Sequence, residues 1–303
     1  MVSALRQPLA HMAVAERRPV PAVARDVLAL AKPRLTLLVL CTTAGGLGLA
    51  PGRREGIAAA ALLAGTALVV GAANALNNFL ERDVDARMRR TRERPLPAGR
   101  LEPWVALAVG LGLPLVALPI LAWFTNGLTA ALATLALFTY VAVYTPMKQH
   151  SSAALFVGAV PGAIPPLMGW TAATGRLDAG GLALFAILFC WQLPHFLAIS
   201  MYLEEDYARG GLRVFALVHG DRATKAWSAA TSLALVPISL TLVALGLAGP
   251  LYAVTATLLG SGLSAYALVG VWRQGENRWA RNFFLLTLMY LTLLFAALLV
   301  SAR

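Results

Sequence analysis

The chain has 303 residues, of which 59% are hydrophobic and only 13% are charged, and its mean hydropathy is +0.71. A soluble domain is nearer half apolar and a quarter charged, so the composition excludes a soluble globular protein and indicates an integral membrane protein. The net charge of +11 is therefore interpreted through membrane topology. Because no soluble segment interleaves aromatic and basic residues, a nucleic-acid-binding function is excluded as well.

Nine apolar runs account for most of the chain, and most have the roughly 17–25 residues that a membrane-spanning helix needs. In chain order the runs are 35–50, 57–80, 104–124, 128–144, 153–173, 182–203, 229–248, 251–272 and 282–301. The first is short, and we expect its helix to begin earlier, near Ala29. The predicted fold is all-α: a polytopic membrane protein with nine transmembrane helices in one bundle over 29–303. Residues 1–28 are expected to form a disordered cytoplasmic tail without a cleavable signal peptide.

Lysine and arginine are distributed unevenly among the loops. The N-terminal segment and the loops after the second, fourth, sixth and eighth runs carry most of the 25 Lys and Arg residues. Cytoplasmic loops carry an excess of these residues, so the N-terminus and the even-numbered loops are predicted to be cytoplasmic. The sequence therefore predicts a protein of the cytoplasmic (inner) membrane, surrounded by the lipid bilayer, with its active site on the cytoplasmic side.

A first polar cluster ends the second apolar run. Asn77, Glu81 and Asp85 recur every four residues, and a helix that turns about 100° per residue places them on one face. Amide and carboxylate oxygens suit Mg²⁺, which proteins usually hold with one or two carboxylates plus substrate phosphates. An arginine-rich segment follows over 82–100, which favours a highly anionic substrate. The alternative is a solvated helix end followed by a positively charged cytoplasmic loop.

A second polar cluster ends the sixth apolar run. His195, Ile199, Tyr202 and Asp206 are spaced to share one helix face, and arginines follow them as they follow the first cluster. Because both clusters end spans on the same predicted side, we expect them to lie opposite each other across a cavity and to hold metal ions. Lys32 and Arg34 open the first span, where snorkelling to the interface explains both and a phosphate contact is an alternative for Arg34.

Several strings carry a family resemblance that covers nearly the whole chain. The segments 77–85 (NNFLERDVD) and 94–99 (RPLPAG) resemble the first signature of the UbiA-type intramembrane prenyltransferases, N-x-x-x-D-x-x-x-D followed by R-P-L/I-P-x-G. The segments 144–148 (YTPMK), 162–170 (GAIPPLMGW), 191–196 (WQLPHF) and 206–209 (DYAR) are similar to the haem-directed branch of that superfamily. Two departures stand out: Glu81 replaces the usual Asp, and the second D-x-x-x-D motif is absent, with His195 and Asp206 on that helix instead.

The resemblance implies an Mg²⁺-dependent transfer of the farnesyl group of farnesyl diphosphate to haem b, giving haem O. By the same resemblance, the catalytic and metal-binding residues are Asn77, Glu81, Asp85 and Asp206. The substrate-binding residues are Lys148, Arg94, Arg209, Arg34, His195 and Tyr144. A haem A synthase that receives the product is implied by analogy alone.

Alternatives remain open at the level of the sequence. A prenyltransferase of the same superfamily could use an aromatic acid or a quinone precursor as the acceptor. A cation-coupled transporter would bind its ions near the membrane midplane, whereas here the acidic residues lie at helix ends on one side. For His195, the sequence does not decide between a structural hydrogen bond, an iron ligand, a base and a hydrogen-bond donor.

Overall fold

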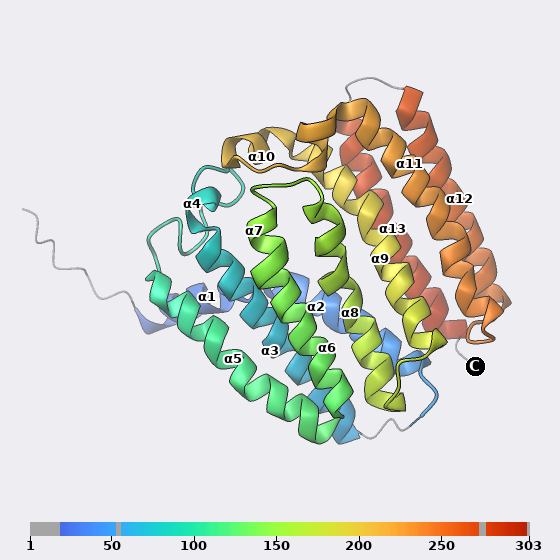
Figure 1. Ribbon diagram of the computed structural model, residues 1–303, viewed down its shortest axis with the longest axis horizontal. Coiled ribbons are helices and arrows are strands. Elements are labelled where there is room, and N and C mark those ends of the chain that lie inside the picture. The colour runs from blue at the N-terminus through green and yellow to red at the C-terminus, as the bar shows by residue number, and fades with distance from the viewer. Residues whose placement is uncertain (1–18, 53–55, 273–276, 302–303) are drawn as a thin grey trace, which may run out of the picture.

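The computed structural model describes residues 19–52, 56–272 and 277–301, and every regular element in these ranges is a helix (Figure 1). The helices are α1 (Val20–Leu30), α2 (Pro33–Leu49), α3 (Gly56–Leu80), α4 (Arg82–Asp85), α5 (Pro103–Phe124), α6 (Gly127–Phe138), the π-helix η1 (Thr139–Tyr144), α7 (Thr145–Met147), α8 (Ala154–Thr174), α9 (Ala179–Tyr202), α10 (Glu204–Gly210), α11 (Phe215–Ala244), α12 (Pro250–Trp272) and α13 (Asn277–Ser301). The predicted all-α membrane fold is confirmed.

The number of spans agrees with the nine apolar runs. Within the described residues, eight helices are long and apolar enough to cross a membrane, and the bent pair α1–α2 raises the number to nine if it forms one span. The outer helices expose large apolar side chains such as Leu115, Trp123 and Leu258, as expected of a lipid-facing surface. α8 and α9 are the most buried spans and therefore form the centre of the bundle.

The first span differs from the prediction. We expected one helix beginning near Ala29, but α1 and α2 are separate helices that meet at an angle of 46°. The break falls at Lys32, which has a left-handed backbone with φ 48° and precedes Pro33. Proline disfavours the helical region for the residue before it and lacks an N–H group, so the helix cannot continue through this point.

The predicted disordered tail also needs correction. Residues 20–28 form most of helix α1, whereas residues 1–18 lie outside the described part of the chain. Asp26 of α1 pairs with Arg100 of the loop after α4, with 3.2 Å between the Asp26 Oδ1 and Arg100 Nε atoms. Helix α1 is thereby attached to the same end of the bundle as the first polar cluster.

Small residues allow the central helices to approach closely, as is common in membrane bundles. A side chain at Gly46 of α2 would collide with the backbone carbonyl of Pro166 in α8, and one at Gly169 of α8 would collide with the backbone carbonyl of Thr43. The two helices therefore touch through their backbones, and this contact joins the first span to the centre of the bundle.

Replacing Gly169 with alanine is expected to destabilise the protein, because the new methyl group meets backbone atoms that cannot rotate away. Overpacking of this kind costs about 1–3 kcal/mol. The measurement is the temperature at which half of the detergent-solubilised protein leaves the monodisperse peak in size-exclusion chromatography. Gly112→Ala is the matched control, since a methyl group there meets nothing within 4 Å. Equal midpoints for the two variants would contradict the prediction.

The two polar clusters lie at one end of the bundle. In Figure 1, α4, α7 and α10 lie toward the upper side of the view, with α4 following the upper end of α3 and α10 following that of α9. The loop after α4 reaches α10, because the backbone N–H groups of Arg89 and Arg90 donate to the Asp206 carboxylate. The fold therefore places the end of α3 and the end of α9 around a common region.

Candidate active site

A cavity of about 230 Å³ lies at this end of the bundle. Its polar and charged lining side chains are Lys32, Asn77, Glu81, Asp85, Arg90, Arg94, Tyr140, Tyr144, Lys148, Ser152, His195, Ser200, Tyr207 and Arg213. Its apolar wall includes Leu155, Phe196, Ile199, Leu212 and Phe215. A single cavity thus joins a strongly charged wall to an apolar one.

Three oxygen-bearing side chains form the charged wall; we call Asn77, Glu81 and Asp85 the oxygen-ligand set. Helix α3 ends at Leu80, yet the spacing survives the break, because Glu81 N donates to Asn77 O at 2.9 Å and Asp85 N donates to Glu81 O at 2.7 Å. The exposed fractions are only 2% for Asn77, 5% for Glu81 and 1% for Asp85. The side chains are buried, which excludes the alternative of a solvated helix end.

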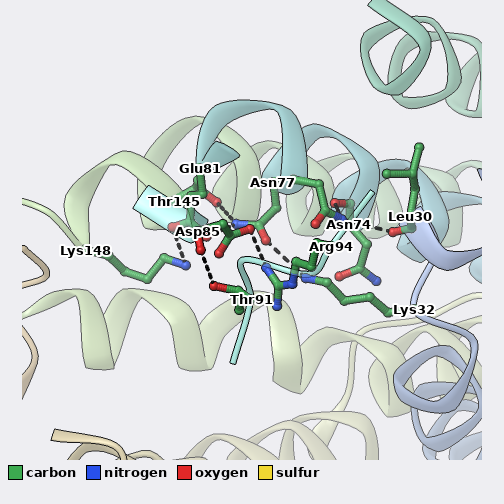
Figure 2. A network of polar contacts seen from close by, with 11 residues as sticks. Leu30, Lys32, Asn74, Asn77, Glu81, Asp85, Thr91, Arg94, Thr145 and Lys148 are labelled. Carbon is green, nitrogen blue, oxygen red and sulfur yellow. Dashed lines mark hydrogen bonds and ion pairs between the residues drawn. The ribbon is translucent and has the colours of Figure 1, made fainter. Parts of the chain in front are cut away.

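Each carboxylate of this set is paired with a cation from another segment (Figure 2). Lys148 Nζ lies 2.6 Å from Glu81 Oε1, and Arg94 Nη1 lies 2.6 Å from Asp85 Oδ2. Both carboxylates are nearly or fully buried, so the pairs offset part of the cost of removing the charges from water. The sequence predicted Arg94 and Lys148 as anion-binding residues, and the structure brings both to the ligand set.

The amide of Asn77 is held from two sides. Its Nδ2 donates to Glu81 Oε2 at 2.7 Å and to Thr145 Oγ1 at 3.4 Å, which leaves Oδ1 as the acceptor. Lys32 Nζ donates to that Oδ1 at 3.1 Å. Lys32 is the residue at the break between α1 and α2, so this break brings the Lys32 ammonium group to Asn77. Lys32, Arg94 and Lys148 together form what we call the cation set.

The oxygen-ligand set fits a divalent metal ion. Asp85 Oδ1 is buried and has no hydrogen-bond partner among the residues that the structure describes. A buried carboxylate oxygen without a partner is costly, and a hard cation would supply the missing interaction. Within the described ranges, no group of three His, Cys, Asp or Glu side chains could hold a metal ion. A metal at this site would therefore share its coordination with an amide oxygen and with oxygens of the substrate.

The π-helix η1 shapes the wall beside the oxygen-ligand set. Tyr140 and Tyr144 both line the cavity, their ring centroids lie 5.4 Å apart, and Lys148 Nζ lies 4.8 Å from the centroid of Tyr144. Thr145, the first residue after η1, donates from its Oγ1 to the Tyr140 carbonyl of η1 at 2.8 Å. Such π segments occur often at functional sites. The predicted substrate residue Tyr144 thus lies in the cavity.

The comparison with known proteins agrees with this geometry. Residues 38–298 match the model of the UbiA prenyltransferase family. The chain belongs to the UbiA prenyltransferase family. Among its relatives, a protoheme IX farnesyltransferase of Anaeromyxobacter sp. (strain Fw109-5) is 67% identical, covering 92% of this chain and 94% of the relative. A protoheme IX farnesyltransferase of Anaeromyxobacter dehalogenans (strain 2CP-C) is 63% identical, covering 96% and 99%.

Solved structures show the same fold at low sequence identity. A digeranylgeranylglyceryl phosphate synthase has a TM-score of 0.78 at 13% identity, covering 92% of this chain and 98% of the other. A UbiA homolog from Archaeoglobus fulgidus bound to GPP and Mg²⁺ has a TM-score of 0.63 at 16% identity, covering 90% and 99%. These likenesses establish the UbiA fold and agree with the all-α bundle described above.

In this UbiA chain, Asp206 has other partners than the oxygen-ligand set. Its Oδ1 accepts from the Arg89 N–H at 2.8 Å and its Oδ2 accepts from the Arg90 N–H at 3.1 Å. Arg209 Nη1 lies 3.3 Å from Oδ1, and Arg209 also pairs with Glu205. Neither Asp206 nor Arg209 lines the cavity. The carboxylate instead fastens the loop after α4 to helix α10.

Two more predicted residues occupy contrasting places. His195 of α9 lines the cavity beside Phe196 and Ile199, on the apolar wall. Arg34 of α2 is exposed and is absent from the cavity lining, so the structure does not bring it to the other site residues.

Sequence reasoning missed three residues of the site. Lys32 was interpreted as an interfacial anchor, and neither Tyr140 nor Thr145 was singled out. The available signals were the Lys-Pro pair at the start of a span and the repeat of tyrosine four residues before Tyr144. The first signal does not show that the Lys32 side chain turns toward Asn77, and the second does not show that Tyr140 lines the cavity.

Proposed function

We propose that the chain transfers the farnesyl group of farnesyl diphosphate to a vinyl group of haem b and so forms haem O. The observation that best supports prenyl transfer from a diphosphate is the buried oxygen-ligand set, which is paired with cations at one end of a membrane bundle. The choice of acceptor rests on relatives named protoheme IX farnesyltransferase, which are 67% and 63% identical over nearly the whole chain.

The charged wall binds the diphosphate in this proposal. The cation set comes from three segments distant in sequence, and each cation already lies within 3.1 Å of an oxygen of the ligand set. When the substrate enters, these cations contact its phosphate oxygens with charge-assisted hydrogen bonds. Mg²⁺ held by Asn77, Glu81 and Asp85 would supply Lewis-acid neutralisation of the leaving pyrophosphate.

The C1–O bond of farnesyl diphosphate breaks, pyrophosphate leaves with the electron pair, and a vinyl carbon of the haem bonds to C1. Water then adds to the cation formed on the haem side and loses a proton, which leaves a hydroxyethylfarnesyl group. In this reaction Phe196 and Ile199 of the cavity lining would exclude water from the allylic cation, and the aromatic rings of Tyr140 and Tyr144, which also line the cavity, would offer it negative charge density.

We assign Asp206 to positioning the loop that carries Arg90 and Arg94, and we leave it out of the metal-binding set. Both of its oxygens already accept hydrogen bonds from backbone N–H groups, and it lies outside the cavity lining. Arg94, four residues beyond the second of these N–H groups, contacts Asp85. The Asp206 carboxylate therefore acts on the site through the backbone of the loop.

The Asp206→Asn variant is expected to lose about tenfold in kcat/KM for farnesyl diphosphate while its half-maximal Mg²⁺ concentration stays unchanged. An asparagine offers one acceptor oxygen, so one partly buried N–H loses its partner, at a cost of about 1 kcal/mol, the low end of the range for such groups. Glu205→Gln, on the exposed neighbouring side chain, is the control and should retain the wild-type rate. A large increase in the Mg²⁺ requirement of Asp206→Asn would return this residue to the metal-binding set.

The proposed function is tested with purified protein, haem b, farnesyl diphosphate and Mg²⁺, with haem O detected by mass spectrometry. We expect haem O in the complete mixture and none when Mg²⁺ is chelated. Parallel reactions offer an aromatic acid in place of haem b. Prenylation of the aromatic acid without formation of haem O would overturn the choice of acceptor while preserving the reaction class.

The orientation and partners follow from the same proposal. The excess of Lys and Arg in the N-terminal segment and the even-numbered loops supports a cytoplasmic location for the cavity, in the cytoplasmic membrane. Farnesyl diphosphate would then reach the charged wall from the cytoplasm, and haem b would enter from the bilayer side. A haem A synthase that accepts the product stays a prediction by analogy.

A further inference from the structure

The imidazole of His195 is fixed on three sides by helices α9 and α13. The ring of Trp191 stacks on it with 4.7 Å between centroids and an interplanar angle of 21°, and the ring of Phe284 stacks with 4.8 Å and 29°. His195 Nδ1 lies 2.9 Å from Thr287 Oγ1. The stacked rings restrict rotation of the imidazole, and the hydroxyl fixes which edge faces α13.

Thr287 decides which nitrogen of the imidazole carries the proton. Its hydroxyl has one hydrogen, which it donates to the Phe284 carbonyl at 2.6 Å. The oxygen can then only accept from His195, so Nδ1 is the protonated nitrogen and Nε2 carries the lone pair. Thr287 is itself fully buried, and its own carbonyl accepts from Trp191 Nε1 at 2.7 Å.

The lone pair of Nε2 is left for a ligand. Nε2 has no hydrogen-bond partner among the described residues, and His195 lines the cavity on its apolar wall. A neutral imidazole binds transition metals such as iron, whereas Mg²⁺ prefers oxygen ligands. The oxygen-ligand set supplies the ligands for Mg²⁺, so the Nε2 atom of His195 is available to bind a different metal ion.

We propose that Thr287 is a positioning residue that holds His195 as its Nδ1–H tautomer, so that Nε2 binds the iron of the haem substrate as an axial ligand. This inference rests on the proposed function, because it takes haem b as the acceptor. Ligation fixes the porphyrin against the apolar wall of the cavity. It transfers no electron and breaks no bond, so its role is to orient a vinyl group toward the farnesyl cation.

The test is titration of the purified protein with ferric haem b, without farnesyl diphosphate or Mg²⁺, followed by absorption and electron paramagnetic resonance spectra. The wild type is expected to show a histidine-ligated spectrum. His195→Ala should lose that spectrum, and added imidazole should restore it. A His195→Ala spectrum equal to that of the wild type overturns the ligation.

Variants of Thr287 test the positioning role separately. Thr287→Val removes the acceptor at nearly the same volume and should weaken haem binding by about 10–100-fold, as is typical when the partner of a metal-binding histidine is lost. Thr287→Ser keeps the hydroxyl and should bind as the wild type does. Thr292→Val is the matched control, because this exposed threonine of α13 only bonds the Leu288 carbonyl. Equal affinities for Thr287→Val and Thr292→Val overturn the positioning role.

The outcomes separate this inference from the proposed function. A wild-type protein that forms haem O but shows no His195-dependent spectrum contradicts the inference and leaves the function intact. A His195-dependent spectrum in a protein that forms no haem O contradicts the function and supports the ligation. If Thr287→Val yields no folded protein, the His195→Ala titration with imidazole rescue still decides the ligation.

Discussion

The Asp85→Asn variant should form haem O at least about a hundredfold more slowly than the wild type. Removing one preorganised electrostatic group from an active site costs about 10²–10³ in kcat, and Asp85 is both buried and paired with Arg94. Asparagine has nearly the same shape, so the change removes charge without opening a cavity. It also leaves the Arg94 guanidinium beside a neutral amide, and the metal loses one anionic ligand.

The measurement is the initial rate at saturating farnesyl diphosphate across a range of Mg²⁺ concentrations. Asp83→Asn is the matched control, since this carboxylate is two residues away, its side chain is 81% exposed, and its ion pair with Arg82 has a long separation of 3.6 Å. The control variant should retain the wild-type rate. Asp85→Asn activity within a few-fold of the control would show that the Asp85 charge has no part in the reaction.

The oxygen-ligand set could be predicted from the sequence because it depends on local geometry. The spacing of Asn77, Glu81 and Asp85 follows the helical repeat, and the backbone hydrogen bonds between them persist although α3 ends at Leu80. Arg94 and Lys148 could be predicted as anion-binding residues because they lie in basic or motif-bearing segments close to the same end of the bundle. Helical periodicity and loop charge were sufficient to predict that these residues lie together at one end of the bundle.

The burial of the set could not be predicted, since it depends on the segment after α4. Thr91, Leu96 and Leu101 of this segment are buried, and Thr91 Oγ1 donates to the Asp85 carbonyl at 2.8 Å. The sequence alone left a solvated helix end as an equal alternative, because the run of arginines gives no indication that the chain folds back over the carboxylates. The tertiary contacts of this segment exclude the solvated helix end.

Long-range contacts also account for the other differences. Lys32 reaches Asn77 across 45 residues through a break with a positive φ angle, which side-chain periodicity cannot reveal. The spacing of Asp206 predicted a shared helix face with His195, and the family resemblance implied a metal ligand, but α9 ends at Tyr202 and α10 begins anew at Glu204. The change of direction presents the Asp206 carboxylate to backbone N–H groups 117 and 116 residues away.

Glu81 provides the second large effect, and two substitutions with opposite outcomes define it. Glu81→Gln should raise the Mg²⁺ concentration for half-maximal rate by at least about tenfold, because one lost charge interaction of about 1.4 kcal/mol or more has that effect. In the structure Glu81 Oε1 lies 2.6 Å from Lys148 Nζ, and Oε2 accepts from Asn77 Nδ2. Glutamine has one oxygen and can offer it either to Lys148 Nζ or to Asn77 Nδ2. Its NH₂ group then faces the other of these two donors.

Glu81→Asp should keep substantial activity, because it retains the charge and restores the residue that the UbiA signature carries at this position. The shorter side chain withdraws the carboxylate by about one methylene group, and the long side chain of Lys148 can follow it. Glu102→Gln, an exposed carboxylate before α5, controls for loss of negative charge at the same end of the bundle. If Glu81→Gln needs no more Mg²⁺ than Glu102→Gln while Glu81→Asp is inactive, then Glu81 acts through its length and its hydrogen bond to Asn77. Its charge would in that case have no role in metal binding.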